Sequence, residues 1–436
     1  MPYKVAFVSL GCAKNLVNTE QMMALCRDAG HTVTGDPEGA DVAVLNTCGF
    51  IESAKSEAIE NILELSQLKD QGKLKKLLVA GCLTQRYPDD IRKELPEVDG
   101  MLGTGSYTDV VTAVEELMAG EHPEHFERID RAYDDGERMV TTPPYTAYLK
   151  IAEGCSNGCA FCIIPKLRGR YRSRTMDSLL REAKELEARG TKELIVIAQD
   201  ITRYGLDLKD GSSLAGLLKE LCKLDFHWIR LHYLYPEVIT DELIDVIAHE
   251  KKIVHYLDIP IQHCNDRILK AMRRHNTRQE LEELFAKLRS AIPDVVLRTS
   301  LICGLPGETD EEFEELCEFL REQKLQRAGV FQFSPEEGTL AERMEDPPGG
   351  AGGGPPVPHY GRVQRGAAGH RHGGAVRGLR LPGGLLRGPH LRRLGGDRRP
   401  CVLHRRGCSP GGHLCERAHH RRVRRGSDRR GGGLSR

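Results

Sequence analysis

The sequence lacks long hydrophobic runs. No stretch approaches the roughly 18 consecutive apolar residues that a membrane-spanning helix requires, so we expect no membrane partner. The N-terminal residues MPYKVAFVSLGC also lack the basic segment, the apolar segment and the cleavage site of a secretory signal. We therefore expect a cytoplasmic protein, in which clustered cysteines indicate metal or redox chemistry more often than structural disulfides.

The net charge of zero conceals two unlike parts of the 436-residue chain. Residues 347–436 hold 20 Arg, no Lys and three acidic residues, a net charge of +17. Residues 1–346 hold 43 basic and 60 acidic residues, a net charge of −17. The length predicts two or three domains, and the change of composition separates the tail from them.

The tail also lacks Ile, Phe, Asn, Thr, Met and Trp, while 23 of its 90 residues are Gly and nine are Pro. It cannot bury enough apolar surface to offset its ordering entropy, so we expect it to be largely disordered. An arginine-rich arm for nucleic acid is one alternative. Out-of-frame translation of GC-rich coding sequence is another, which the abrupt change at residues 345–347 and the absence of a regular RGG repeat favour. Cysteine and histidine residues in the tail imitate a metal site without any element to support it: Cys401, His404, Cys408, His413 and Cys415.

Residues 1–120 alternate short apolar runs with helical patterns. Strands are expected at 5–10, 42–46, 77–80 and 101–102, and helices at 18–29, 52–69, 89–93 and 108–119. Fully apolar strands between helices are typical of a parallel sheet covered on both faces. The sequence therefore predicts an α/β fold that begins with an open parallel-sheet domain and continues with a polar linker at 121–146.

A second series of alternating elements occupies residues 147–346. Strands are expected at 147–152, 193–198, 228–231, 256–259, 295–302 and 329–333, and helices at 176–189, 214–221, 241–249, 267–272, 278–291 and 310–323. Six strand–helix repeats are too few for a complete eightfold barrel. We predict a partial (βα)6 barrel with its active site at the C-terminal ends of the strands.

Three cysteines lie within eight residues directly after the first barrel strand, namely Cys155, Cys159 and Cys162 of EGCSNGCAFC. Structural zinc normally needs four ligands, and no fourth Cys or His lies nearby in the sequence. Three thiolates on a 4Fe–4S cluster leave one iron open for a substrate or cofactor. The alternative is a chance grouping of cysteines in a loop.

A second set of three cysteines is dispersed over the first domain. Cys12, Cys48 and Cys82 each lie just past the end of an expected strand and next to a glycine. The C-terminal ends of parallel strands share one edge, where ligands bind, and neighbouring strands are about 4.8 Å apart. The three thiols could therefore converge on one group. Buried cysteine acting as a small apolar side chain is the alternative, and it suits the cysteines inside expected helices: Cys26, Cys222 and Cys317.

The motif of Cys155, Cys159 and Cys162 resembles that of the radical S-adenosylmethionine (SAM) superfamily. Both cysteine sets together, over about residues 3–345, resemble the methylthiotransferases of that superfamily. The resemblance implies two 4Fe–4S clusters, a radical SAM cluster held by this motif and an auxiliary cluster held by Cys12, Cys48 and Cys82. It also implies that SAM supplies both the methyl group and a 5′-deoxyadenosyl radical, which activates the target C–H bond.

Three short sequence segments are similar to those of the RimO branch of this family: SLGCAKNLVNTE at 9–20, NTCGFIESAKSE at 46–57 and CIIPKLRGRYRSR at 162–174. The resemblance implies an aspartate of small-subunit ribosomal protein uS12 as substrate, modified at its β-carbon, and an electron donor such as flavodoxin or ferredoxin. The MiaB branch, which modifies a tRNA adenosine, typically has Gln-Met-Asn in place of Ala13-Lys14-Asn15. That branch, or a non-catalytic iron–sulfur or nucleic-acid-binding protein, is the alternative.

Residues after the barrel strands are candidates for SAM contacts. Gln199 and Asp200 follow the second strand and Gly304 follows the fifth, although Asp200 could instead cap a turn and Gly304 could begin one. Arg298 would need an anion such as the SAM carboxylate if it pointed inward. The basic run at 166–174 could contact substrate or RNA, or form a solvated loop. The family usually ends in a small β-barrel, the TRAM domain, but no alternating strands follow Phe333.

Overall fold

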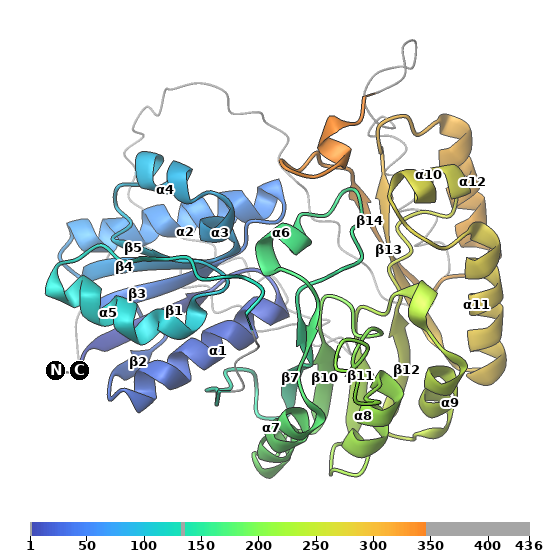
Figure 1. The fold of residues 1–436 in the computed structure, drawn as a ribbon, viewed down its shortest axis with the longest axis horizontal. Helices are drawn as coiled ribbons and strands as arrows, with labels where there is room; N and C mark the ends of the chain where they lie inside the picture. The colour runs from blue at the N-terminus through green and yellow to red at the C-terminus, as the bar shows by residue number, and fades with distance from the viewer. Residues whose placement is uncertain (1, 132–135, 346–436) are drawn as a thin grey trace, which may run out of the picture. The chain divides into compact units, whose positions relative to one another are not determined.

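The computed structural model describes residues 2–131 and 136–345, which belong to one compact unit (Figure 1). The predictions for the tail at 347–436, including its cysteines and histidines, lie outside the described residues. None of the helices in the described part of the chain combines the length and the apolar character needed to cross a bilayer.

Residues 4–125 form a six-stranded sheet in which every pair of neighbours is parallel. The strand order β2-β1-β3-β4-β5-β6 places the change of direction between β1 and β3, where ligands bind in open α/β sheets. The strands are β1 (Lys4–Ser9), β2 (Thr32–Thr34), β3 (Ala40–Thr47), β4 (Leu74–Gly81), β5 (Gly100–Leu102) and β6 (Glu124–His125).

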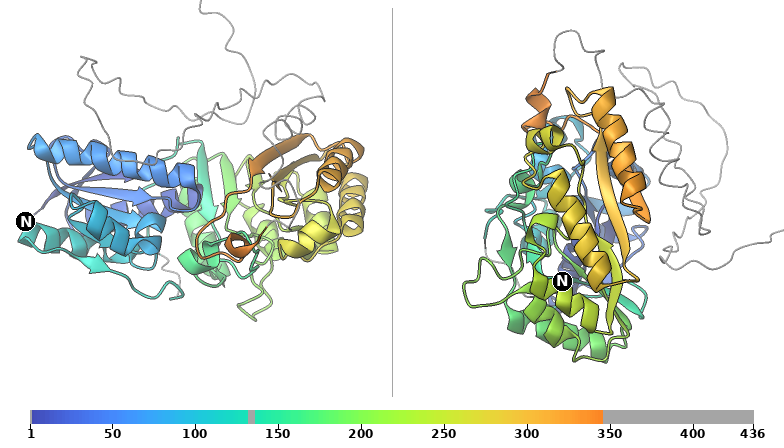
Figure 2. Two further views of the ribbon diagram at one scale, coloured as in Figure 1. Left: turned by 90° about the horizontal axis from the view of Figure 1, so that it is seen from above. Right: turned by 90° about the vertical axis from the view of Figure 1, so that its right-hand side faces the viewer.

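Helices cover both faces of this sheet (Figure 2). Successive residues of β3 point to opposite faces, so Val42 and Val44 join one apolar cluster while Ala43 and Leu45 join the other. The first cluster includes α1 (Ala13–Asp28) and α5 (Val110–Ala119), and the second includes α2 (Glu52–Asp70), α3 (Cys82–Arg86) and α4 (Pro88–Glu94). The predicted parallel sheet covered on both faces is confirmed.

A second parallel sheet has the strand order β14-β13-β12-β11-β10-β7, so its strands follow one another in chain order. Its six strands are β7 (Thr146–Lys150), β10 (Glu193–Ile197), β11 (Trp228–Leu231), β12 (Ile253–Asp258), β13 (Val296–Cys303) and β14 (Arg327–Gln332). The connecting helices are α7 (Met176–Ala188), α8 (Leu214–Leu221), α9 (Asp241–His249), α10 (Asp266–Ala271), α11 (Arg278–Ala291) and α12 (Asp310–Glu322). This arrangement is the predicted open, partial (βα)6 barrel.

The two faces of the barrel sheet differ in polarity. Along β13, Leu297 and Leu301 are buried in the apolar cluster that includes the helices, whereas Arg298 and Ser300 alternate with them and are half-buried. On this second face the guanidinium of Arg298 pairs with Asp258 at 2.7 Å. The inner face of the barrel therefore carries a charged pair between β12 and β13.

Three short pairings were not predicted from the sequence. β2 and β6 are edge strands of three and two residues, too short to show a periodicity, and β6 lies within the range assigned to a linker. After β7, β8 (Ala152–Glu153) forms a two-residue antiparallel ribbon with β9 (Arg172–Ser173), and α6 (Ile164–Arg168) lies between them in the chain. This ribbon closes the loop that carries Cys155, Cys159 and Cys162.

Part of the range 121–146 is anchored by a buried ion-pair network. The side chain of Arg138 is 4% exposed; its Nε lies 2.7 Å from Glu182, and the guanidinium also contacts Glu20 and the carbonyl of Tyr148. Arg174, also buried, is the second cation paired with Glu182. Desolvation raises the pKa of Glu182, but the two arginines outweigh it and hold the pKa below its ordinary value.

Replacing Glu182 by Gln is expected to lower the free energy of unfolding by about 3 kcal/mol, because two buried guanidinium groups lose a shared carboxylate. Chemical denaturation at neutral pH measures this loss, and Glu185→Gln on the exposed face of the same helix is the matched control. A Glu182→Gln protein as stable as the control would show that the network contributes nothing.

The same pair of proteins gives a pH dependence with a definite sign. Because the folded-state pKa of Glu182 is lowered, its contribution is complete above the ordinary carboxyl range and is lost as pH falls through the folded pKa. The stability difference between wild type and Glu182→Gln should therefore shrink below about pH 4. A difference that stayed constant to pH 2 would contradict this assignment.

Candidate functional site

Cys12, Cys48 and Cys82 lie past the C-terminal ends of three adjacent strands, β1, β3 and β4. The backbone is packed closely there. A Cβ added to Gly11, which has φ +84°, would lie 2.6 Å from the Cβ of Cys48, and a Cβ added to Gly49 would lie 3.0 Å from the carbonyl carbon of Cys82. A side chain at Gly11 or Gly49 would therefore push the cysteine-bearing segments apart, which explains the glycine at these two positions.

The three thiols affect one another's ionisation. Burial raises the pKa of Cys48 to about 11, and the neighbouring Cys82 and Cys12 contribute to the rise. Burial also raises the pKa of Cys82. Desolvation raises the pKa of Cys12 as well, but the positive charges of Lys14 and Arg168 outweigh it and lower this pKa, and the backbone N–H groups of the first turn of α1 act in the same direction. The surrounding positive groups thus favour the thiolate form of Cys12, the form that binds metals.

The second cysteine set lies in the loop between β8 and α6. Three contacts fix this loop: the side chain of Asn157 donates to Asp200 at 2.9 Å, the N–H of Cys155 donates to Gly169 at 3.1 Å, and the N–H of Ala160 donates to Met272 at 2.9 Å. The loop is therefore held by hydrogen bonds to elements on both of its sides.

Burial raises the pKa of Cys155 to about 11 and that of Cys162 to about 12. The charge of Cys159 contributes to both rises. In the described part of the chain, no three Cys, His, Asp or Glu side chains converge on a position for a single metal ion. Three thiolates in one loop suit a cluster, in which each thiolate binds a different iron.

Arg168, the last residue of α6, connects the two cysteine sets. Its side chain is 5% exposed, donates to the Sγ of Cys82 at 3.3 Å and also to the side chain of Asn15. It pairs with Glu153 at 3.5 Å. Apolar packing also joins α6 to Cys82, in a cluster that consists of Ile163, Leu167, Cys82 and Phe50. The helix that follows Cys162 therefore packs directly against Cys82 of the other set.

Glu153 supplies the negative charge that pairs with Arg168 between the two cysteine sets. It also accepts from Lys150 at 2.9 Å and from the side-chain amide of Gln199 at 2.6 Å. Desolvation raises its pKa, yet Lys150 and Arg168 hold the pKa far below the ordinary value. Lys150 reaches across to Asn18 of α1 at 2.8 Å. The carboxylate stays ionised and fixes Gln199 at the end of β10.

The four candidate SAM-contact residues differ in whether their polar groups already have a partner within the protein. Asp200 is occupied by Asn157, Thr202 and Arg203, and Arg298 is occupied by Asp258. The N–H of Gly304, which has φ +84°, donates to the carboxylate of Glu308, so this segment forms the tight turn considered as an alternative. Gln199 differs, because its Oε1 is buried without a hydrogen-bond partner among the described residues.

The basic run at 166–174 is only partly a surface, because Lys166 and Arg170 are exposed whereas other members are buried. Arg168 and Arg174 are buried in ion pairs, and Lys166 donates to the carbonyl of Gly338 at 2.7 Å. Sequence patterns gave no sign of this, because the partners lie far away in the chain. Four other residues of these contacts were likewise not singled out as site residues from the sequence: Asn15, Asn18, Lys150 and Glu153.

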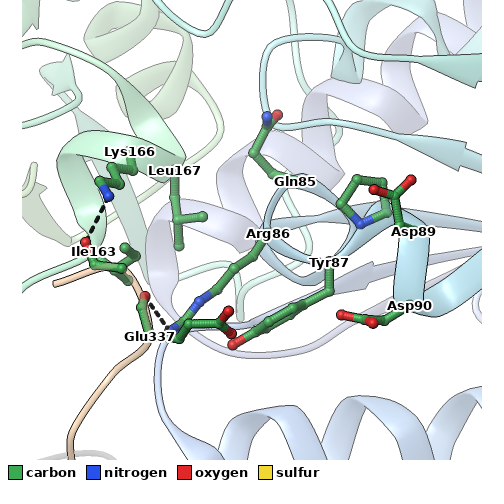
Figure 3. A pocket seen from close by; sticks show the side chains of 11 residues that line it. Gln85, Arg86, Tyr87, Asp89, Asp90, Ile163, Lys166, Leu167 and Glu337 are labelled. Carbon is green, nitrogen blue, oxygen red and sulfur yellow. Dashed lines mark hydrogen bonds between the residues drawn. The ribbon is translucent and has the colours of Figure 1, made fainter. Parts of the chain in front are cut away.

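A pocket of about 320 Å³ lies beside α6 (Figure 3). Its lining residues come from α3, α4, α6 and the segment at 337–338, and no cysteine is among them. Arg86 is fixed at its edge by Glu336 at 2.8 Å and by the carbonyls of Gly49 and Glu337 at 2.8 and 3.0 Å. These contacts hold the loop after Cys48 against the segment that follows β14.

The partial barrel and its cysteine loop define the class of protein, a radical SAM enzyme. Residues 149–320 match the radical SAM superfamily, and residues 4–103 match the uncharacterized protein family UPF0004. The radical SAM methyltransferase TsrM from Kitasatospora setae, solved with a tryptophan substrate and a SAM analogue, superposes with a TM-score of 0.56 at 13% identity, covering 75% of this chain and 72% of that chain. The cobalamin-dependent radical enzyme OxsB has a TM-score of 0.52 at 12% identity, covering 78% and 55%. At these identities the likeness shows the fold alone.

Curated relatives are far more similar in sequence. The ribosomal protein uS12 methylthiotransferase RimO of Lachnoclostridium phytofermentans is 52% identical over 345 residues, which are 79% of this chain and 78% of the relative. The protein of the same name from Clostridioides difficile is 49% identical over 343 residues, 78% and 77% of the two chains. This chain belongs to the RimO family of radical SAM methylthiotransferases. Its cofactors are SAM and 4Fe–4S clusters.

Proposed function

We propose that this enzyme adds a methylthio group to the β-carbon of an aspartate in ribosomal protein uS12. Support comes from the relatives, which are named as methylthiotransferases of ribosomal protein uS12, and from one structural observation. Arg168 and α6 join the two cysteine sets directly, so that groups held by the two sets would face a shared space. An enzyme that moves a sulfur-containing group from one centre to a carbon activated at the other needs such proximity.

We assign one 4Fe–4S cluster to each cysteine set. Cys155, Cys159 and Cys162 would hold the radical SAM cluster within residues 147–346. Cys12, Cys48 and Cys82 would hold an auxiliary cluster within residues 1–120, and residues 121–146 connect the two domains. When bound, SAM and the clusters supply the one-electron chemistry, the methyl group and the sulfur attachment point.

The chain's own residues orient these groups. The unpartnered Oε1 of Gln199 is suited to accept a hydrogen bond from the ammonium group of SAM, since Glu153 already fixes the other end of the amide. Asp200 would act as a positioning residue, because it holds Asn157 within the cysteine loop. Arg168 would steady the auxiliary site by donating to Cys82.

We also place the enzyme in the cytoplasm, with an electron donor of the flavodoxin or ferredoxin class. Such a donor is required because cleavage of SAM consumes an electron that the chain does not itself supply.

An assay of the anaerobically reconstituted full chain with SAM, a reductant and a uS12 peptide that contains the target aspartate tests this function. We expect a mass gain of one methylthio group located on the aspartate by fragmentation. An unmodified peptide, together with methylthiolated adenosine in a parallel tRNA reaction, would overturn the proposal. A peptide with asparagine at the target position is the control for site assignment.

A further inference from the structure

Lys14 is a nearly buried cation without a partner. It is the second residue of α1, two positions after Cys12, and is 9% exposed. Its Nζ lies 3.7 Å from the centroid of the Tyr233 ring, and within the described residues it has no hydrogen bond or ion pair. A cation–π contact contributes roughly 0.5–2 kcal/mol, which is less than the cost of desolvating an ammonium group. The ammonium group of Lys14 is therefore available to bind an anion.

Tyr233 fixes the other side of this position. It follows β11 at the mouth of the barrel and has φ +68°, a left-handed conformation that costs a bulky residue about 1–3 kcal/mol. The ring of His232 lies 5.8 Å from that of Tyr233, and the buried Nε2 of His232 has no hydrogen-bond partner among the described residues. The Nζ of Lys14 and the imidazole of His232 thus lie close to the same ring, that of Tyr233.

Lys14 lies two residues after Cys12 at the start of α1, and its Nζ contacts the ring of Tyr233, the residue that follows His232. Burial is the main cause of the lowered pKa of His232, and Lys14 is among the charges that lower it further. Lys14 also acts on Cys12. The unpartnered ammonium therefore lies between the first cysteine set and the C-terminal ends of the barrel strands, where a substrate side chain must enter to meet both.

The chemistry of the substrate indicates which anion belongs there. In aspartate the carbon to be modified is bonded directly to the side-chain carboxylate. A cation that binds this carboxylate beside Cys12 would present the neighbouring carbon to the auxiliary site, and a charge-assisted hydrogen bond to a carboxylate is strong enough to select it. Arg168 cannot take this role, because Asn15, Cys82 and Glu153 occupy its guanidinium.

We propose that Lys14 binds the side-chain carboxylate of the substrate aspartate and determines the enzyme's preference for aspartate over its neutral isostere asparagine. The inference rests on the proposed function, because it assigns a residue to that substrate. Lys14 acts in binding, and His232 offers a second polar contact on the same side.

Binding of labelled uS12 peptides to the reconstituted full chain without reductant tests the inference independently of turnover. Fluorescence anisotropy compares a peptide carrying aspartate with the same peptide carrying asparagine. Wild type should bind the aspartate peptide at least about tenfold more tightly. Lys14→Met and Lys14→Gln should bind both peptides equally, at the wild-type affinity for the asparagine peptide. Lys75→Met, on an exposed lysine of the same domain, should retain the wild-type preference.

Iron and sulfide contents of all variants, measured in parallel, separate a binding role from a role in cluster assembly. Undiminished preference for aspartate in both Lys14 variants would overturn the inference while leaving the function intact, provided that wild type still modifies the aspartate peptide. An equal loss of affinity for both peptides, accompanied by loss of iron, would also overturn it, since Lys14 would then support the cluster. Failure of wild type to bind or modify the aspartate peptide would instead refute the proposed function.

Discussion

Replacing Cys155, Cys159 and Cys162 together by alanine should lower the formation of 5′-deoxyadenosine from SAM at least about 1,000-fold, because the radical chemistry belongs to the group that these thiolates hold. Chromatography of reactions with dithionite measures the loss. The loop itself should survive, since the side chain of Asn157 and the backbone N–H of Ala160 fix it through contacts that involve no sulfur.

Cys222→Ala is the control for this variant, because that thiol lies at the end of α8 and burial raises its pKa to about 12. It should cleave SAM at the wild-type rate. Continued cleavage by the triple variant would mean that another part of the chain carries the radical chemistry, and the assignment of this cysteine loop would be wrong.

The second prediction separates the two halves of the reaction. Alanine at Cys12, Cys48 and Cys82 should leave 5′-deoxyadenosine formation within about threefold of wild type, while methylthio transfer to the uS12 peptide falls below detection. The reason is structural. These cysteines belong to the strand ends of the first sheet. Cys82 contacts α6 through an apolar cluster that alanine preserves and through a hydrogen bond from Arg168 to its Sγ that alanine removes.

Both products are measured in one reaction, by chromatography for the nucleoside and by mass spectrometry for the peptide. A variant that still transferred the methylthio group would remove any need for a second centre. Loss of SAM cleavage in a variant that kept the radical SAM cluster would instead show that the two sets work as a single unit.

Much of this site could be predicted from the sequence, because its geometry follows from strand order. Apolar runs located the strands, and the C-terminal ends of parallel strands meet at one edge, so Cys12, Cys48 and Cys82 could be grouped without a structure. The edge strands β2 and β6 could not be found in this way, since two or three residues at the border of a sheet have no apolar alternation.

The polar connections could not be predicted at all. A basic run is normally exposed, yet Arg168 is buried against Asn15, a residue 153 positions earlier in the sequence. Whether a charged side chain is paired inside the protein depends on partners that only the fold brings together. For the same reason the sequence could not show that Asp258 occupies Arg298, or that Lys14 is left without a partner.

The number of iron and sulfide ions per reconstituted chain tests most directly whether the enzyme works with two cubane centres. Wild type should hold about eight of each, and either triple alanine variant about four, because each set of thiolates secures its own centre. A wild-type chain that saturates at about four irons, with one triple variant unaffected, would contradict the account.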